Sequence, residues 1–240
     1  MKKISAFIVV LFFSLSLFAQ KQINDANAQV RDVKNFHAIK VSTGIELTLT
    51  QGESEAVAVS ASDLADRDKI KTVVENGVLK IYFDVDAWKW WRDNRGNKKL
   101  RAYVSIVKID DLDMSAGALV KVEGELKSDK LGLDISSGAQ FNGKVSVGSL
   151  NVDQSSGAQV NISGKASSIN IDGSSGSVFN GYELIVENAD IDTSSGSVAE
   201  LTINKELSAE ASSGGSIRFK GEGVIRNIKT GSGGAVSKRS

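Results

Sequence analysis

Hydrophobic and polar residues alternate along much of this chain, and a small residue followed by glycine interrupts the alternation at nearly regular intervals. The glycines of these pairs are Gly117, Gly138, Gly157, Gly176, Gly196, Gly214 and Gly233, spaced 18 to 21 residues apart. A near-constant period of about 19 residues over seven copies is typical of a solenoid, in which each repeat adds one coil. At each corner the glycine supplies a positive φ or room for close approach.

Aligning the repeats on these glycines gives columns of mainly apolar residues. The column seven positions before the glycine holds Leu131, Leu150, Ile169, Ala189 and Leu207; the column five before holds Leu133, Val152, Ile171, Ile191 and Ala209; the column three after holds Val120, Phe141, Val160, Phe179, Ala199, Ile217 and Val236. Residues in one column lie about 4.8 Å apart on successive coils, so these columns predict inward-facing ladders. The pattern predicts an all-β chain folded as a single-stranded parallel β-helix, right-handed because parallel crossovers overwhelmingly take that hand.

Residues 36–110 precede the repeats and also have a β pattern. The turn at Asn76-Gly77 between two apolar runs predicts a hairpin, and the charged stretch 63–69 predicts one helical turn. We expect residues 36–110 to form an N-terminal β region that covers one end of the solenoid of residues 111–240, because an open end exposes unpaired strand edges. Residues 20–35 are expected to be a linker or a loose first strand, and Lys238 and Arg239 to discourage stacking at the other end.

The first residues resemble a targeting signal rather than part of the fold. Lys2 and Lys3 precede an apolar run that ends at Ala19, which predicts a Sec-type secretory signal peptide over residues 1–19. The alternative is a membrane anchor, but the run is shorter than the roughly 20 residues that a span needs. We therefore expect an exported protein of the periplasm or cell surface, without a membrane span after cleavage.

Composition excludes several kinds of site. The chain has no cysteine, which excludes disulfides and thiolate sites, and its formal net charge of zero gives no bulk attraction to nucleic acid. The repeated serines beside the glycines have no general base near them in sequence, because His37, the only histidine, lies outside the repeats. Serine catalysis is therefore not expected.

At this level of detail the chain resembles one family. The residues that carry the resemblance are the pattern Phe36-x-x-Ile39-x-Val41-x-x-Gly44-Ile45-Glu46-Leu47-x-Leu49-x-Gln51-Gly52, the later Val78-Leu79-Lys80-Ile81, and the Ser-Gly coils. They are similar to the head GIN domain family, also called "putative autotransporter adhesin", over about residues 31–240. The name-giving Gly-Ile-Asn reads Gly44-Ile45-Glu46 here. The resemblance implies a pectin-lyase-like β-helix, a role in adhesion and no established catalytic residues.

An acidic column is the most regular polar feature of the repeats. Four positions before each glycine stand Asp113, Asp134, Asp153, Asp172, Asp192 and Glu210, followed by Lys229. Stacked carboxylates repel, and one remedy is a hard cation such as Ca²⁺, for which Asp134, Asp153, Asp172 and Asp192 are the candidate ligands. Because Ca²⁺ takes six to eight oxygens and each coil offers one carboxylate, we favour the alternative of a solvated outer column without a cofactor.

A tryptophan cluster breaks the repeat pattern between residues 88 and 99. We expect Trp88, Trp90, Trp91, Arg92 and Arg95 to form a ligand contact, since aromatic faces stack on sugars and basic groups meet anions. Surface glycans or anionic lipid head groups suit an exported protein better than nucleic acid. In the alternative, the tryptophans plug the end of the β-helix.

These observations favour an exported, non-enzymatic protein of the cell envelope, adhesin-like, that binds a glycan or another surface partner. One alternative is a polysaccharide-acting lyase or hydrolase, because the pectin-lyase-like helices that the chain resembles include enzymes that cleave uronates. Another is a purely structural envelope component or a sensor domain.

Overall fold

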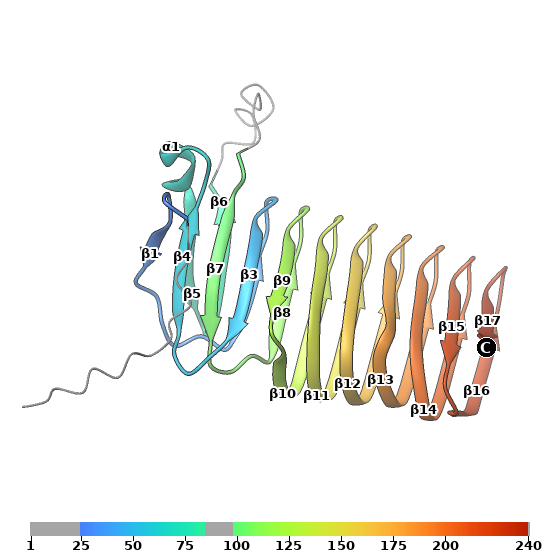
Figure 1. The fold of residues 1–240 in the computed structure, drawn as a ribbon. Coiled ribbons are helices and arrows are strands. Elements are labelled where there is room, and N and C mark those ends of the chain that lie inside the picture. The colour runs from blue at the N-terminus through green and yellow to red at the C-terminus, as the bar shows by residue number, and fades with distance from the viewer. Residues whose placement is uncertain (1–24, 85–97, 240) are drawn as a thin grey trace, which may run out of the picture.

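The computed structural model describes residues 25–84 and 98–239. In this part of the chain, 17 strands and one short helix form a single sheet that winds into a straight solenoid (Figure 1). Successive coils pair in parallel with a 19-residue offset, as where Gln140 faces Gln159. The predicted all-β, parallel solenoid is therefore confirmed. The expected signal peptide lies outside the described residues.

The elements follow one another along the chain without long loops. They are β1 (Gln29–Arg31), β2 (Ala38–Val41), β3 (Glu46–Gln51), β4 (Ala56–Ser60), α1 (Leu64–Arg67), β5 (Ile70–Glu75), β6 (Val78–Phe83), β7 (Arg101–Ile106), β8 (Asp111–Met114), β9 (Leu119–Glu123), β10 (Leu126–Ile135), β11 (Gln140–Gln154), β12 (Gln159–Gly173), β13 (Val178–Thr193), β14 (Val198–Ala211), β15 (Ser216–Lys220), β16 (Val224–Thr230) and β17 (Ala235–Lys238). The predicted single helical turn is α1, and the predicted hairpin is β5–β6.

Each full coil contributes two successive strand stretches, and the stretches stack into two parallel ladders. One ladder runs β6, β2, β8 and then through the second halves of β10 to β14 to β16. The other runs β7, β3, β9 and then through the first halves of β11 to β14 to β15 and β17. Antiparallel strands precede both ladders at the N-terminal end: β5 lies on β6, and β4 and β1 follow β7.

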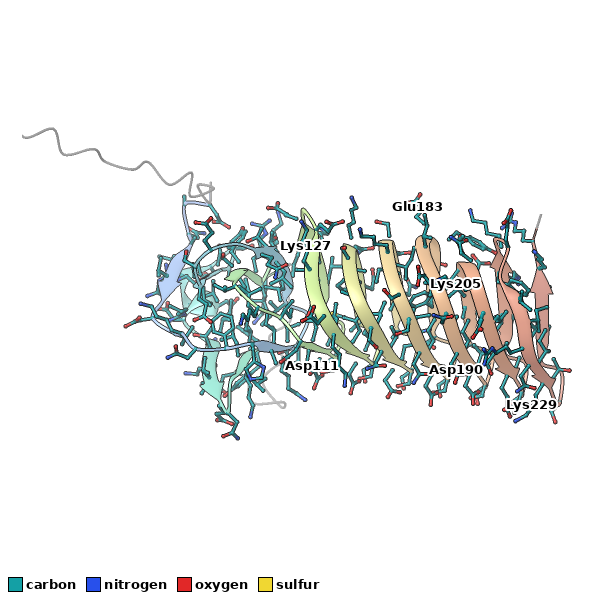
Figure 2. All side chains as sticks on the ribbon, turned by 90° about the horizontal axis from the view of Figure 1, so that it is seen from below. Asp111, Lys127, Glu183, Asp190, Lys205 and Lys229 are labelled. Atoms are coloured by element: carbon teal, nitrogen blue, oxygen red, sulfur yellow. The ribbon has the colours of Figure 1, made fainter. Side chains whose placement is uncertain are left out.

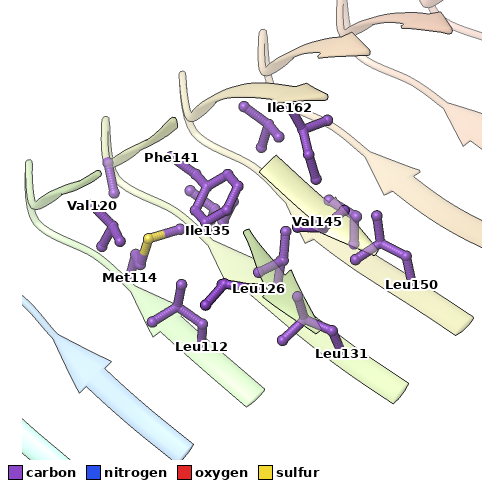
Figure 3. Packing of buried hydrophobic residues seen from close by; sticks show 14 of the residues in the cluster. Leu112, Met114, Val120, Leu126, Leu131, Ile135, Phe141, Val145, Leu150 and Ile162 are labelled. Carbon is purple, nitrogen blue, oxygen red and sulfur yellow. The ribbon is translucent and has the colours of Figure 1, made fainter. Parts of the chain in front are cut away.

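The core is a stack of aliphatic layers between the two ladders. Every residue of the three predicted columns is buried except Val236 in the last coil, which is half-buried. Figure 3 shows side chains of neighbouring coils, such as Leu112 and Leu131, in contact inside the solenoid. Phe141, Phe179 and Phe219 are the largest fully buried side chains. Single coils bury too little to be stable alone, so stability comes from stacking.

The corners of the solenoid are tight turns with two residues at positive φ. Gly157 has φ of +72°, as predicted for the glycine column, and Ser156 before it has φ of +53°. The same pair of values recurs in all seven copies. Corners are joined by the backbone: the Gly138 N–H donates to the Ser156 carbonyl at 3.0 Å. The serines therefore act as turn residues.

Candidate functional site

One outer surface of the solenoid carries the predicted acidic column. Strand register places Asp113, Asp134, Asp153, Asp172, Asp192 and Glu210 side by side on successive coils, with half-exposed or exposed side chains. We call this surface, the outer side of the ladder that ends in β16, the aspartate face. Lysines close the column at both ends, because Lys40 pairs with Asp113 and Lys229 lies 3.4 Å from Glu210. Figure 2 shows Asp111, Asp190 and Lys229 along this side, opposite Lys127 and Glu183.

Mutual repulsion changes the proton affinity of this face. Burial, followed by the charges of Asp113 and Asp153, raises the pKa of Asp134 above its usual value of 3.8. Burial, followed by Glu210 and Asp172, does the same to the pKa of Asp192. At the end of the column, the hydrogen bond to Asp113 raises the pKa of Lys40. The column thus carries unrelieved like-charge repulsion in its middle and compensated charge at its ends.

The aspartate face does not provide a metal site. Across residues 25–84 and 98–239, no three His, Cys, Asp or Glu side chains come together so that they could hold a metal ion. The column is spread at one carboxylate per coil, whereas Ca²⁺ needs six to eight oxygens around one point. The candidate ligands Asp134, Asp153, Asp172 and Asp192 therefore remain an outward row of charges.

The other outer surface carries an amide ladder that the sequence analysis did not single out. Asn142, Asn161 and Asn180 stand in one column on β11, β12 and β13. The Asn161 side-chain NH₂ donates to Asn142 Oδ1 at 2.9 Å, and that of Asn180 donates to Asn161 Oδ1 at 2.8 Å. We call these three residues the asparagine ladder and their surface the asparagine face. A sequence signal existed, since each asparagine stands four positions after its glycine.

A groove of about 750 Å³ lies over the asparagine ladder. Its lining includes Thr48, Lys121, Asn142, Lys144, Asn161, Ser163, Asn180, Tyr182 and Glu183, from strands β3, β9, β11, β12 and β13. Glycine keeps the groove open at Gly143, where a Cβ would lie 2.7 Å from Val122 Cγ2 and 2.8 Å from Phe141 Cζ. The groove therefore depends on small residues as well as on the amides.

A bulge in β13 forms one wall of the groove. Between Gly181, which faces Leu201, and Ile185, which faces Thr202, β13 has three residues more than β14. Tyr182 lies in this bulge, with Lys220 Nζ 5.2 Å and the Arg239 guanidinium 5.5 Å from its ring centre. Such cation–π contacts hold an aromatic ring in place at a surface. Tyr182 is thus a fixed, half-buried aromatic side chain beside the amides.

Two lysines of the groove are paired with carboxylates outside its lining. Lys121 Nζ lies 2.6 Å from Glu46 Oε1, and Lys144 Nζ lies 3.4 Å from Glu125 Oε1. Among the remaining lining residues, the amides, hydroxyls and tyrosine are uncharged. Each amide of the ladder uses one donor and one acceptor within the column, which leaves Asn161 with one N–H and one oxygen lone pair for a ligand. The groove therefore offers regularly spaced, largely neutral hydrogen-bonding groups.

The predicted tryptophan contact cannot be placed beside this groove. Trp88, Trp90, Trp91, Arg92 and Arg95 all lie outside the described residues. His37, the only histidine, forms an exposed pair with Asp110, at 2.9 Å from Nδ1 to Oδ1. In the described part of the chain, 25–84 and 98–239, no helix has the length and hydropathy needed to cross a bilayer.

The sequence matches the family model described as "Putative auto-transporter adhesin, head GIN domain" over residues 35–223. The chain belongs to the head GIN domain family. The predicted resemblance is therefore confirmed over most of the chain. Membership indicates an extracytoplasmic, adhesin-like protein, and the family is described by adhesion rather than by an enzyme activity. A search of the curated proteins finds no match.

Solved structures share the fold of this head GIN domain. A "putative adhesin" from Bacteroides fragilis is 17% identical, with a TM-score of 0.76 over 88% of this chain and 96% of that one. A "putative adhesin" from Parabacteroides merdae is 16% identical, with a TM-score of 0.67 over 89% and 96% of the two chains. A "putative lipid binding protein" from Parabacteroides distasonis is 15% identical, with a TM-score of 0.66 over 90% and 98%. At such identities the likeness concerns the fold alone.

Proposed function

We propose that this protein is an exported, non-enzymatic, adhesin-like protein of the periplasm or cell surface that binds glycans in the groove over the asparagine ladder. The observation that carries the proposal is the ladder itself, which presents amide groups at a spacing of about 4.8 Å on neighbouring coils. Sugar hydroxyls accept from and donate to such amides, and Tyr182 offers an aromatic face beside them.

The neutrality of the groove sets the class of glycan. Because Lys121 and Lys144 are each paired with a glutamate, no unpaired basic cluster is supplied by these two residues. Recognition of phosphates or uronates relies on unpaired Arg or Lys. A largely neutral oligosaccharide therefore fits better than a polyuronate, which also argues against the alternative of a pectin-lyase-like enzyme.

A glycan array probed with the mature chain, residues 20–240, tests this function together with a uronate-cleavage assay. We expect binding to neutral oligosaccharides and no cleavage of uronate polymers. Cleavage would establish the polysaccharide-acting alternative, and an array without any binding would contradict the proposal. Binding confined to polyuronates would contradict the assigned ligand class.

A second contact is proposed for the tryptophan cluster, which stays a prediction from the sequence. If Trp88, Trp90 and Trp91 stack on sugars, replacing all three with alanine should weaken glycan or cell binding while the melting temperature is unchanged. Arg92→Ala with Arg95→Ala should weaken binding only to anionic ligands. Unfolding of the triple tryptophan variant would instead favour the alternative that these residues plug the end of the solenoid.

A further inference from the structure

The two ends of the solenoid differ from its sides because they have free strand edges. Within residues 25–84 and 98–239, four strands pair on one side only. At the N-terminal end, β1 pairs with β4 and β5 pairs with β6. At the C-terminal end, β16 pairs with β14 and β17 pairs with β15. Free edges are templates for pairing with another chain.

The free strands at one end match those at the other in position and length. The ladder that ends in β16 begins at β5, and the ladder that ends in β17 begins at β1, so each ladder has one free strand at each end. Strand β16 has seven residues and β5 has six, whereas β17 has four and β1 has three. A second copy shifted along the solenoid axis would therefore place β16 beside β5 and β17 beside β1 (Figure 1).

The strand directions also allow this pairing. Because β5 is antiparallel to β6 and the rest of its ladder is parallel, β16 would meet β5 of the next copy as an antiparallel strand. Because β1 and β4 reverse direction twice, β17 would meet β1 of the next copy as a parallel strand. Arg31 already donates to the Ile70 carbonyl at 3.4 Å, so the free edge of β5 runs from Lys71 to Glu75.

Exposed apolar side chains gather at the same two ends. Of the nine large hydrophobic residues described as exposed, six lie on the four end elements β1, α1, β5 and β16. They are Val30, Leu64 and Val73 at the N-terminal end and Val224, Ile225 and Ile228 at the C-terminal end. Ile225 and Ile228 continue the inward columns of Leu207 and Ala209, yet they are 47% and 40% exposed because no further coil covers them. The C-terminal end is thus an open cross-section of the core.

The charges of the two ends are opposite. Residues 216–239 contain six basic residues and one acidic residue, whereas residues 25–84 contain seven basic and ten acidic residues. Two C-terminal ends in contact would bring like charges together, in agreement with the expectation that Lys238 and Arg239 discourage such stacking. A C-terminal end against an N-terminal end brings opposite charges together.

We propose that copies of this protein associate head to tail, with β16 and β17 of one copy extending the ladders that begin at β5 and β1 of the next. The contact is heterologous, so it can repeat along the solenoid axis and continue both ladders from copy to copy. It leaves the groove over the asparagine ladder on the side of each copy, and it stands or falls independently of the glycan proposal.

Sedimentation velocity on the mature chain and two single variants tests the contact. Val73→Lys places a charge on the free β5, and Ile228→Lys places one on the open end of the core, with Ile225→Lys as a substitute if the last coil melts early. We expect the unmodified chain to form larger species as concentration rises and sodium chloride falls. Each variant alone should form none, while an equimolar mixture should form dimers, because each partner keeps the end that the other lacks.

Val107→Lys, which charges an exposed residue on neither end, is the matched control and should assemble like the unmodified chain. A chain that stays monomeric up to about 1 mM, the range of the weakest specific contacts, would overturn the proposal. Dimers of the Val73→Lys variant alone would also overturn it, because they would reveal a symmetric contact between two C-terminal ends. A mixture of the two variants that stays monomeric would exclude the head-to-tail geometry.

Discussion

At the scale of single residues, the corners show which part of a turn the sequence reveals. The glycine column predicted positive φ at Gly138 and Gly157, since only glycine adopts that conformation without strain. The serine before each glycine has positive φ too, which the sequence did not predict. Serine is common in turns of any kind, so its presence does not specify a left-handed conformation, and only the backbone pairing between corners requires it.

Two glycines with positive φ should respond very differently to alanine. At Gly157 a Cβ would meet nothing within 4 Å, so Gly157→Ala costs only backbone strain, about 1–2 kcal/mol. At Gly164 a Cβ would lie 2.0 Å from the Val145 carbonyl oxygen, so Gly164→Ala must displace the neighbouring coil and should cost more than about 4 kcal/mol. Urea denaturation measures both losses, and Gly138→Ala should match Gly157→Ala. Equal losses at Gly157 and Gly164 would contradict the packing described around Gly164.

At the scale of strands, the sequence predicted the aspartate face better than the asparagine face. The acidic column was visible because six coils repeat a carboxylate at one position. The asparagine ladder occupies only three coils, between Lys121 and Glu200 in the same column, and its hydrogen bonds require the register of whole strands. The bulge at Tyr182 left one trace, the 20-residue spacing from Gly176 to Gly196, but a spacing cannot show where in the coil the extra residues lie.

Removing one charge from the aspartate face should stabilise the fold in a pH-dependent way. Asp134 has a folded pKa above 3.8, so the folded state binds its proton more readily than the unfolded state. The ionised carboxylate therefore costs stability at neutral pH, and that cost disappears as pH falls through the folded pKa to below 3.8. Asp134→Asn should raise the free energy of unfolding by about 0.2–1 kcal/mol at neutral pH and low salt.

Parallel urea titrations of Asp134→Asn and the unmodified chain at neutral and acid pH measure this gain. It should shrink in 1 M salt, where the Debye length is about 3 Å, and vanish below the unfolded pKa. Asp129→Asn, an exposed carboxylate outside the column, should change stability by less than about 0.5 kcal/mol. A gain that is the same at every pH would show that repulsion within the column is not its cause.

At the scale of the whole molecule, repetition made the fold predictable. Seven similar coils repeat the same evidence, so a single ambiguous position such as Ala189 does not change the result. The described ends are less predictable because they repeat nothing: the antiparallel β5–β6 pair and the open β16 follow from which neighbours are present. The groove likewise arises from side chains of five strands that are far apart in sequence.

The proposed function assigns ligand binding to one side of one coil stack, and β12 provides a matched pair of residues to test that assignment. Asn161 and Asn170 are both exposed asparagines of β12, the first on the asparagine face within the groove and the second on the aspartate face. Calorimetric titration of an oligosaccharide bound on the array should show at least about tenfold weaker affinity for Asn161→Ala, the loss of about 1.4 kcal/mol of hydrogen bonding, and unchanged affinity for Asn170→Ala. Unchanged affinity for Asn161→Ala, or an equal loss in both variants, would contradict the groove as the binding site.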